Sequence, residues 1–226
     1  IDPSGNLVKL PSAKTAEEVL ATKLPSLPIA KRIASALDHG VAFQVSPGAK
    51  LAKTFEYLGR RARIDLTWDT QAQAARDAGP LVTLLGSLTL RSWLDLILTP
   101  LGLTVVPGAE GLVITSRTAD NGQLLQTGVR QRETEKRIGR SLKKPVNFEL
   151  RDASWAVLFE LLDEQLDEPF ALDPIALRDG KVPREAVLNG SAQDEPADQA
   201  LAKLLGTLGL TFKVRDEAVL IVPKGP

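Results

Sequence analysis

Two stretches of the chain decide the fold because they are nearly the same. Residues 31–45 read KRIASALDHGVAFQV, and residues 136–150 read KRIGRSLKKPVNFEL. The correspondence returns near the end of each copy, where LGLT occurs at 101–104 and again at 208–211. A repeat of this length is a duplicated domain, because solenoid units run to about 20–50 residues. The sequence therefore predicts two similar modules in tandem rather than one large domain around a single cleft.

The composition is that of a folded globular protein. The chain has 226 residues, of which 43% are hydrophobic and 25% are charged, and this length supplies two hydrophobic cores. Its 28 basic and 28 acidic residues cancel, so the net charge gives no attraction to nucleic acid. The absence of cysteine excludes disulfides, thiol catalysis and cysteine-ligated zinc. We find no apolar run of the roughly 18 residues that a membrane span needs, and no signal segment at the start.

Apolar periodicity predicts the same series of elements in both copies. In the first copy we expect a leading helix at 29–38, strands at 41–45, 64–68 and 81–85, helices after Leu51 and after Thr89, and a hairpin at 103–106 and 112–115. In the second copy we expect a leading helix at 131–143, strands at 146–150, 170–173 and 186–188, helices at 154–166 and 197–207, and a hairpin at 210–214 and 218–222.

The expected fold class is α+β. Each module has the order β-α-β-β-α-β-β, forms a small mixed sheet with helices packed on it, and is preceded by a short helix. The predicted division is an N-terminal extension at 1–28, a first module at 29–118, a linker at 119–129 and a second module at 130–226. A capping box, Thr15 to Glu18, predicts a short helix in the extension.

These motifs resemble the STN module, the short domain at the N-terminus of secretins and of TonB-dependent signalling receptors. The resemblance covers residues 41–116 and 146–223. Two features depart from the family pattern, because two modules stand in tandem with no barrel sequence after them, and because the leading helices are additions. The first copy carries the resemblance in Phe43-Gln44-Val45, Leu51 to Leu58, Ile64-Asp65-Leu66, Leu85 to Leu90, Leu94 to Leu98 and Leu101 to Thr104. The second carries it in Phe148-Glu149-Leu150, Leu158-Phe159, Leu161-Leu162, Phe170-Ala171-Leu172, Leu188-Asn189-Gly190, Ala200-Leu201, Leu204-Leu205 and Leu208 to Thr211.

The resemblance implies a role in interaction rather than in catalysis. STN modules of secretins stack into rings in the periplasm, and those of receptors pass a signal to a membrane-bound regulator. By this resemblance we expect a non-enzymatic, periplasmic or otherwise extracytoplasmic oligomerisation module, without cofactor or metal, whose partner is another copy or an envelope protein. The alternative is a ligand- or signal-sensing adaptor that closes on its ligand between the two modules, which predicts a polar cleft there.

Two clusters of charge stand at nearly the same point of the two copies, after or near the end of a predicted helix. Their opposed charges predict a head-to-tail contact between the copies or between neighbouring chains. A third interpretation, RNA binding by the basic cluster, requires a Gly-x-x-Gly loop, and only Gly59 is present. Calcium binding by the acidic run would require a loop glycine that is absent. The candidate interaction surface consists of Arg60, Arg61 and Arg63 in the first copy and Asp163, Glu164, Asp167 and Glu168 in the second.

No pattern in the chain marks a catalytic site. His39 is the only histidine, so a pair of imidazole metal ligands is excluded, and its place at a predicted helix end is typical of capping. The three tryptophans, Trp68, Trp93 and Trp155, are expected to pack in or beside the cores. Phosphate-binding loops and nucleophile elbows are absent from the sequence. The sequence therefore predicts no catalytic, cofactor-binding or metal-binding residues.

Overall fold

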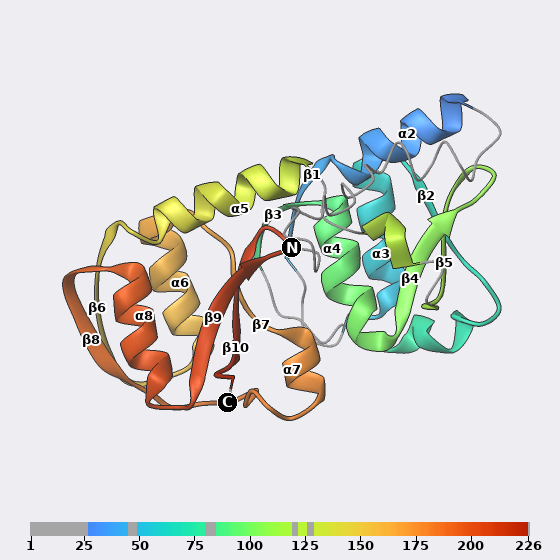
Figure 1. Cartoon of the computed structure of the whole chain (residues 1–226). Helices are drawn as coiled ribbons and strands as arrows, with labels where there is room; N and C mark the ends of the chain where they lie inside the picture. Colours follow the sequence, from blue (N-terminus) through green and yellow to red (C-terminus); the bar gives the residue numbers. More distant parts are fainter. Residues whose placement is uncertain (1–26, 45–48, 80–84, 119–121, 126–128, 226) are drawn as a thin grey trace, which may run out of the picture.

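The computed structural model describes residues 27–44, 49–79, 85–118, 122–125 and 129–225 (Figure 1). Its helices and strands confirm the α+β class. The extension with its capping box, and the strand expected at 81–85 except for Leu85, lie outside the described residues. Residues 27–125, the first half, contain α2 (Leu27–Leu37), β1 (Gly40–Gln44), α3 (Leu51–Ala62), β2 (Asp65–Trp68), η1 (Gln73–Asp77), β3 (Leu85–Thr89), α4 (Leu90–Leu98), η2 (Thr99–Leu101), β4 (Leu103–Pro107), β5 (Gly111–Ser116) and η3 (Gly122–Leu125). Residues 129–225, the second half, contain α5 (Val129–Ser141), β6 (Pro145–Ala153), α6 (Trp155–Leu166), β7 (Phe170–Leu172), α7 (Pro174–Arg178), β8 (Leu188–Pro196), α8 (Ala197–Gly206), β9 (Leu210–Arg215) and β10 (Ala218–Pro223).

The strands pair in the same way in the two halves. A two-stranded antiparallel ribbon joins β1 to β3 in the first half and β6 to β8 in the second. A three-stranded sheet has the order β2-β5-β4 in the first half and β7-β10-β9 in the second. In both sheets the central strand is parallel to the first neighbour and antiparallel to the second. The halves therefore share one topology, while their origin by duplication stays a prediction from the sequence.

Figure 1 shows these elements as a row of layers. In the second half, α6 and α8 lie between the β6–β8 ribbon and the three-stranded sheet. In the first half, α4 and α3 lie between the β1–β3 ribbon and its own three-stranded sheet. The halves meet where β3 approaches the chain before β7, and a Cβ atom added at Gly86 would lie 2.9 Å from Cβ of Pro169. Only glycine allows this close approach.

Strands β7 and β10 are buried on both faces, and their successive residues point to opposite sides of the sheet. On β10, Val219 and Ile221 pack in the core of the second half, whereas Ala218 and Leu220 belong to the core of the first half. On β7, Ala171 likewise joins the first-half core. The two cores therefore do not separate at the predicted domain boundary, because residues of β7 and β10 belong to the core of the first half. The division into domains stays a prediction from the sequence.

Three segments differ from the sequence-based expectation. The strand expected near 186–188 is β8, which begins at Leu188 and continues to Pro196 through polar residues that carry little apolar alternation. The loop expected after β7 begins with α7, which the Asp173 side chain caps by accepting a hydrogen bond from the Ala176 amide. The predicted linker contains η3, whose Leu124 and Leu125 are buried in the first-half core.

Candidate functional site

The predicted charged clusters lie at equivalent ends of equivalent helices. Helix α3 ends in the left-handed residue Arg63, with φ 56°, and α6 ends in the left-handed residue Asp167, also with φ 56°. A left-handed residue ends many helices, and it turns the chain away from the helix axis. The two ends thus have the same backbone geometry and opposite charge.

The basic end is exposed and electrostatically favourable. Arg60, Arg61 and Arg63 are all exposed, and cations near a helix C-terminus interact well with its dipole. Arg60 forms an exposed ion pair with Glu56 at 3.4 Å, and the Arg61 guanidinium lies 5.8 Å from the centre of the Tyr57 ring. These contacts orient the side chains while leaving them open to a partner.

Arg60 and Arg63 also line a shallow hollow of about 560 Å³ between α3, β2 and the turn that joins β4 to β5. Its other charged residues are Lys53, Asp65, Arg76, Glu56 and Glu110, so cations outnumber carboxylates by one. Arg61 is not among its lining residues. The structure therefore brings two of the three predicted arginines around one hollow.

The acidic end carries carboxylates where the helix dipole disfavours them. Glu164 and Asp167 are exposed, and Asp163 is half-buried. Burial raises the pKa of Asp163, and the neighbouring carboxylates of Asp167 and Glu164 raise it further. Glu160, one turn earlier, is exposed as well and extends the acidic stripe; its spacing of four residues from Glu164 could have revealed it in the sequence. Such a face favours a basic partner.

Glu168 was predicted at this surface and does not lie there. Its side chain has an exposed fraction of 0% and accepts a hydrogen bond of 2.5 Å from Arg137 Nη1 on α5. Burial raises the pKa of Glu168, while the Arg137 guanidinium lowers it. An acidic run in the sequence does not reveal which member turns inward, since the left-handed residue Asp167 redirects the chain just before Glu168.

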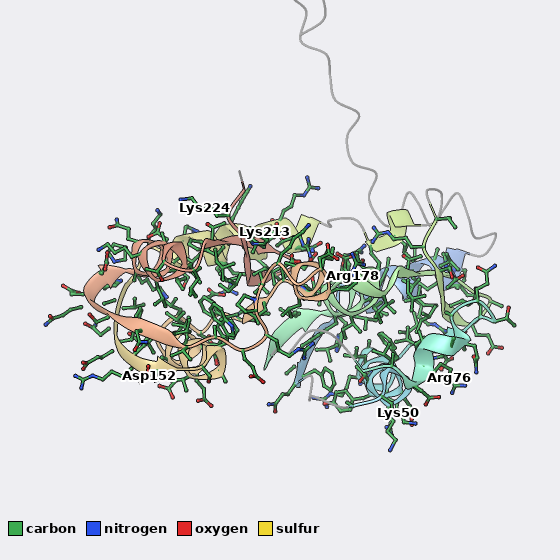
Figure 2. All side chains as sticks on the ribbon, turned by 90° about the horizontal axis from the view of Figure 1, so that it is seen from below. Lys50, Arg76, Asp152, Arg178, Lys213 and Lys224 are labelled. Carbon is green, nitrogen blue, oxygen red and sulfur yellow. The ribbon has the colours of Figure 1, made fainter. Side chains whose placement is uncertain are left out.

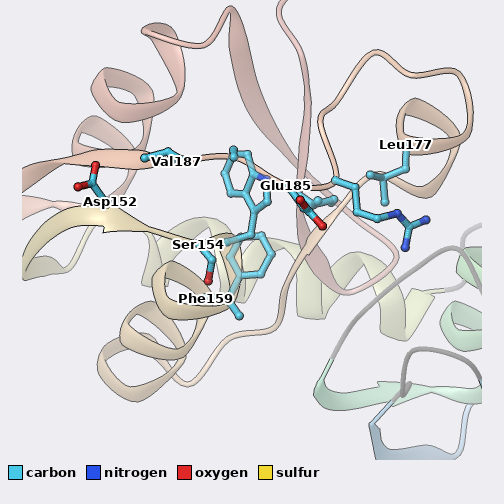
Figure 3. A pocket seen from close by; sticks show the side chains of 11 residues that line it. Asp152, Ser154, Phe159, Leu177, Glu185 and Val187 are labelled. Atoms are coloured by element: carbon cyan, nitrogen blue, oxygen red, sulfur yellow. The ribbon is translucent and has the colours of Figure 1, made fainter.

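A second feature, an apolar hollow, lies beside the N-terminus of α6 (Figure 3). It has a volume of about 610 Å³, within the range of small-molecule sites. Its apolar walls come from α6, β7, α7 and the segment before β8, and its polar rim carries both signs of charge. The lining residues are Asp152, Ser154, Trp155, Ala156, Phe159, Leu172, Leu177, Arg184, Glu185, Ala186 and Val187.

The floor of this apolar hollow is aromatic and fixed. The rings of Trp155 and Phe159 stack with centres 6.0 Å apart, and Phe159 stacks in turn on Phe170 at 6.1 Å. The Trp155 indole N–H donates a hydrogen bond of 3.1 Å to the Pro183 carbonyl. Since its polar atom is satisfied, Trp155 presents an apolar face to the hollow.

An exposed valine stands at the rim of the apolar hollow. Val187 there is 64% exposed, whereas Val157 on α6, which is 43% exposed, does not line the hollow. The sequence identified Trp155 only as a packing residue, and the hollow was missed because its walls come from four separate elements. This hollow is not a cleft between the halves, because all its lining residues belong to the second half.

The two other tryptophans and the single histidine make contacts that stabilise the fold. Trp93 is buried and donates a hydrogen bond of 2.9 Å to the Val41 carbonyl, and Trp68 packs edge-on against Phe55. His39 follows α2, and its backbone carbonyl accepts from the Leu90 amide. Among the described residues, no group of three or more acidic or histidine side chains could hold a metal ion.

Within the described part of the chain, no helix is both long and apolar enough to cross a membrane.

Figure 2 shows the side chains on the two halves, with Lys50 and Arg76 on the first half, Asp152 on the second and Arg178 near their junction. Comparison of the chain with protein-family models, with curated proteins and with solved structures gives no match.

Proposed function

We propose that the protein is a non-enzymatic interaction module that associates with copies of itself, head to tail. The C-terminal end of α3 in one copy would contact the C-terminal end of α6 in the next. The observation that carries this proposal is the opposite charge at two structurally equivalent helix ends, with Arg60 and Arg61 on one and Glu164 and Asp167 on the other. An extracytoplasmic location is part of the proposal and rests on the resemblance to STN modules.

The contact is heterologous, because two different surfaces meet. A heterologous contact leaves one free surface of each kind at the ends of an assembly, so it closes into a ring or grows as a filament. Opposite charges steer the approach and set the orientation. Exposed ion pairs contribute at most about 1 kcal/mol each, and dissolved salt screens them. Assembly should therefore weaken as the salt concentration increases.

A charge-exchange experiment tests this contact. One variant, Arg60→Glu with Arg61→Glu, makes the α3 end acidic. A second variant, Glu160→Lys with Glu164→Lys and Asp167→Asn, makes the α6 end basic, because two cations then face the one remaining carboxylate of Asp163. Each variant alone then presents like charges at both ends and is expected to sediment as a monomer. An equimolar mixture restores complementary pairs at both contacts and is expected to assemble as the unchanged protein does.

Melting temperatures of the two variants serve as the control, since all five substituted residues are exposed and should not affect folding. Assembly of either variant alone, or failure of the mixture to assemble when the unchanged protein does, contradicts the head-to-tail contact. Salt dependence measured in parallel separates charge steering from apolar association.

The apolar hollow beside α6 favours a second candidate function, binding of an apolar ligand or of one large apolar side chain of a partner. Ala186→Phe places a ring in the hollow, and it should abolish the fluorescence of bound 8-anilinonaphthalene-1-sulfonate without lowering the melting temperature. Equal dye binding by this variant and the unchanged protein would mean that the hollow is not a binding site.

A further inference from the structure

The turn between β9 and β10 carries two acidic residues into the junction of the halves. Asp216 and Glu217 have exposed fractions of only 4% and 3%. Their carboxylates contact residues of β3, just before α4, and of α5. Two buried carboxylates at the tip of a hairpin are unusual, because acidic residues are rarely buried without partners.

The Glu217 carboxylate forms a hydrogen bond with the first half. Its Oε2 accepts a hydrogen bond of 2.6 Å from the Thr89 amide, immediately before α4. The Thr89 hydroxyl accepts from the Ser92 amide, so the side chains of both residues serve the start of the helix. A carboxylate next to a helix N-terminus is favoured by the dipole. This bond joins segments that are distant in the sequence and belong to different halves.

Asp216 lies within a cluster that has more carboxylates than cations. Its Oδ1 accepts from Gln131 Nε2 at 3.0 Å, and its Oδ2 accepts from Arg215 Nε at 2.6 Å. Its backbone amide donates to Glu135 Oε1 at 3.0 Å. The charged groups that face the cluster are Asp95 on α4, Glu135 on α5, Glu217 on the turn, Arg215 and Lys213 on β9, and Asp173 after β7.

The backbone of this turn is strained. Asp216 and Glu217 have φ of 53° and 60°, the left-handed values of a two-residue hairpin turn that normally selects Asn-Gly. Such strain persists where the surroundings hold it in place, and it marks residues kept for their side chains. Here the Glu217 carboxylate connects the halves, which glycine at that position could not do.

Proton binding at the cluster follows from the same geometry. Burial raises the pKa of Asp216 to about 7, and the carboxylates of Asp95 and Glu135 add to this rise while Arg215 opposes it. Burial and the Glu217 charge also raise the pKa of Glu135, against its backbone hydrogen bonds. The docked turn therefore retains a proton that an exposed aspartate would lose near pH 4.

We infer that the Asp216–Glu217 turn is a latch that holds the two halves together more tightly at acid pH. In the docked state Glu217 is bonded to Thr89, and in the released state this bond is broken. The docked turn binds a proton more strongly than the released turn, so acid favours docking. The equilibrium constant for release should rise by up to about tenfold per pH unit between roughly pH 4 and pH 7. Above about pH 7 both forms have lost the proton, and the release constant should stay level.

Hydrogen exchange of the Thr89 amide reports release directly, because this amide is bonded to Glu217. After correction for the intrinsic pH dependence of exchange, its protection should fall from pH 5 to pH 7 and then remain constant to pH 8.5. In Asp216→Asn the fall should become smaller, because this proton-binding group is gone while Glu135, whose pKa is also raised, remains. Asp194→Asn is the matched control, since Asp194 is exposed and also left-handed, with φ 50°.

An equal pH dependence of protection in Asp216→Asn and in the unchanged protein overturns the latch. Should Asp216→Asn fail to fold, carbon-13 NMR of the aspartate carboxyl groups in the unchanged protein decides the question. Titration of Asp216 well above the ordinary range near pH 4 supports the latch, and titration within that range contradicts it.

Discussion

The two three-stranded sheets have the same strand order, yet their central strands, β10 and β5, are buried to different extents. In β10 the sequence AVLIV supplies an apolar residue at every position, as a strand buried on both sides requires. In β5 the corresponding sequence GLVIT buries Leu112 and Ile114 and leaves Val113 partly exposed. Beside it on β2, Asp65 and Thr67 are exposed. One topology therefore gives a central strand that is buried on both faces or one that is partly exposed on one face, according to the residues on that face.

The residues that precede α4 and α8 also differ between the halves. Thr89 precedes α4 and donates its amide to Glu217, whereas Pro196 precedes α8 at the corresponding place and has no amide hydrogen. The first half can therefore accept an acidic hairpin tip through this bond, and the second half cannot.

The largest expected effect comes from the face of β10 that packs on the first half. Leu220→Ala should lower the free energy of unfolding by about 2–4 kcal/mol, because Leu220 is fully buried and its loss leaves a cavity. Val113→Ala, at the corresponding position of β5, should cost less than about 1 kcal/mol because Val113 is partly exposed. Urea denaturation measures both, and equal losses would mean that the two sheets are covered alike.

Thr89→Pro makes the start of α4 resemble the start of α8. Proline fits the backbone, since Thr89 has φ −64° and ψ 154°. It removes both the amide that Glu217 accepts from and the hydroxyl that caps Ser92, so we expect a loss of about 2–3 kcal/mol. Thr89→Ser retains both groups and should cost under about 1 kcal/mol in the same thermal or urea measurement.

Glu217→Gln should have a smaller effect of about 1 kcal/mol. The amide oxygen can still accept from Thr89, but the charge that favours the helix start is lost. Glu110→Gln, on the exposed loop between β4 and β5, is its counterpart in the other sheet and should be neutral within about 0.5 kcal/mol. A double-mutant cycle of Glu217→Gln with Thr89→Pro should show coupling, and additivity would deny the contact.

The smallest effect concerns the titration of Asp216. Glu135→Gln keeps an oxygen to accept the Asp216 amide and removes a negative charge that raises the pKa of Asp216. The pKa of the Asp216 carboxyl should therefore move down, as carbon-13 NMR would report. An unchanged or higher value would show that Glu135 does not act on the cluster.

The sequence revealed the elements whose signals are local. The hairpin of β9 and β10 and the helix α6 lie where apolar periodicity placed them, and α4 begins directly after Thr89 as predicted. Pro100 lies in the short 3₁₀ segment η2, which follows α4. These features depend on neighbouring residues, which a single sequence contains.

Features that depend on distant residues were missed. The burial of Leu124 and Leu125 in the predicted linker, and of Glu168 in the acidic run, follows from partners far along the chain. The turn at Asp216 and Glu217 appears in the sequence as an ordinary charged hairpin tip, because nothing local shows that Gln131 and Thr89 face it. The apolar hollow likewise needs four separate elements to form.

Absolute mass in solution, measured by light scattering over a range of protein and salt concentrations, tests the proposed self-association most directly. Head-to-tail contact between the α3 and α6 ends predicts a mass well above the 24.3 kDa of one chain at low salt, decreasing toward it as salt is added. A mass of one chain at every protein concentration and at low salt would contradict it.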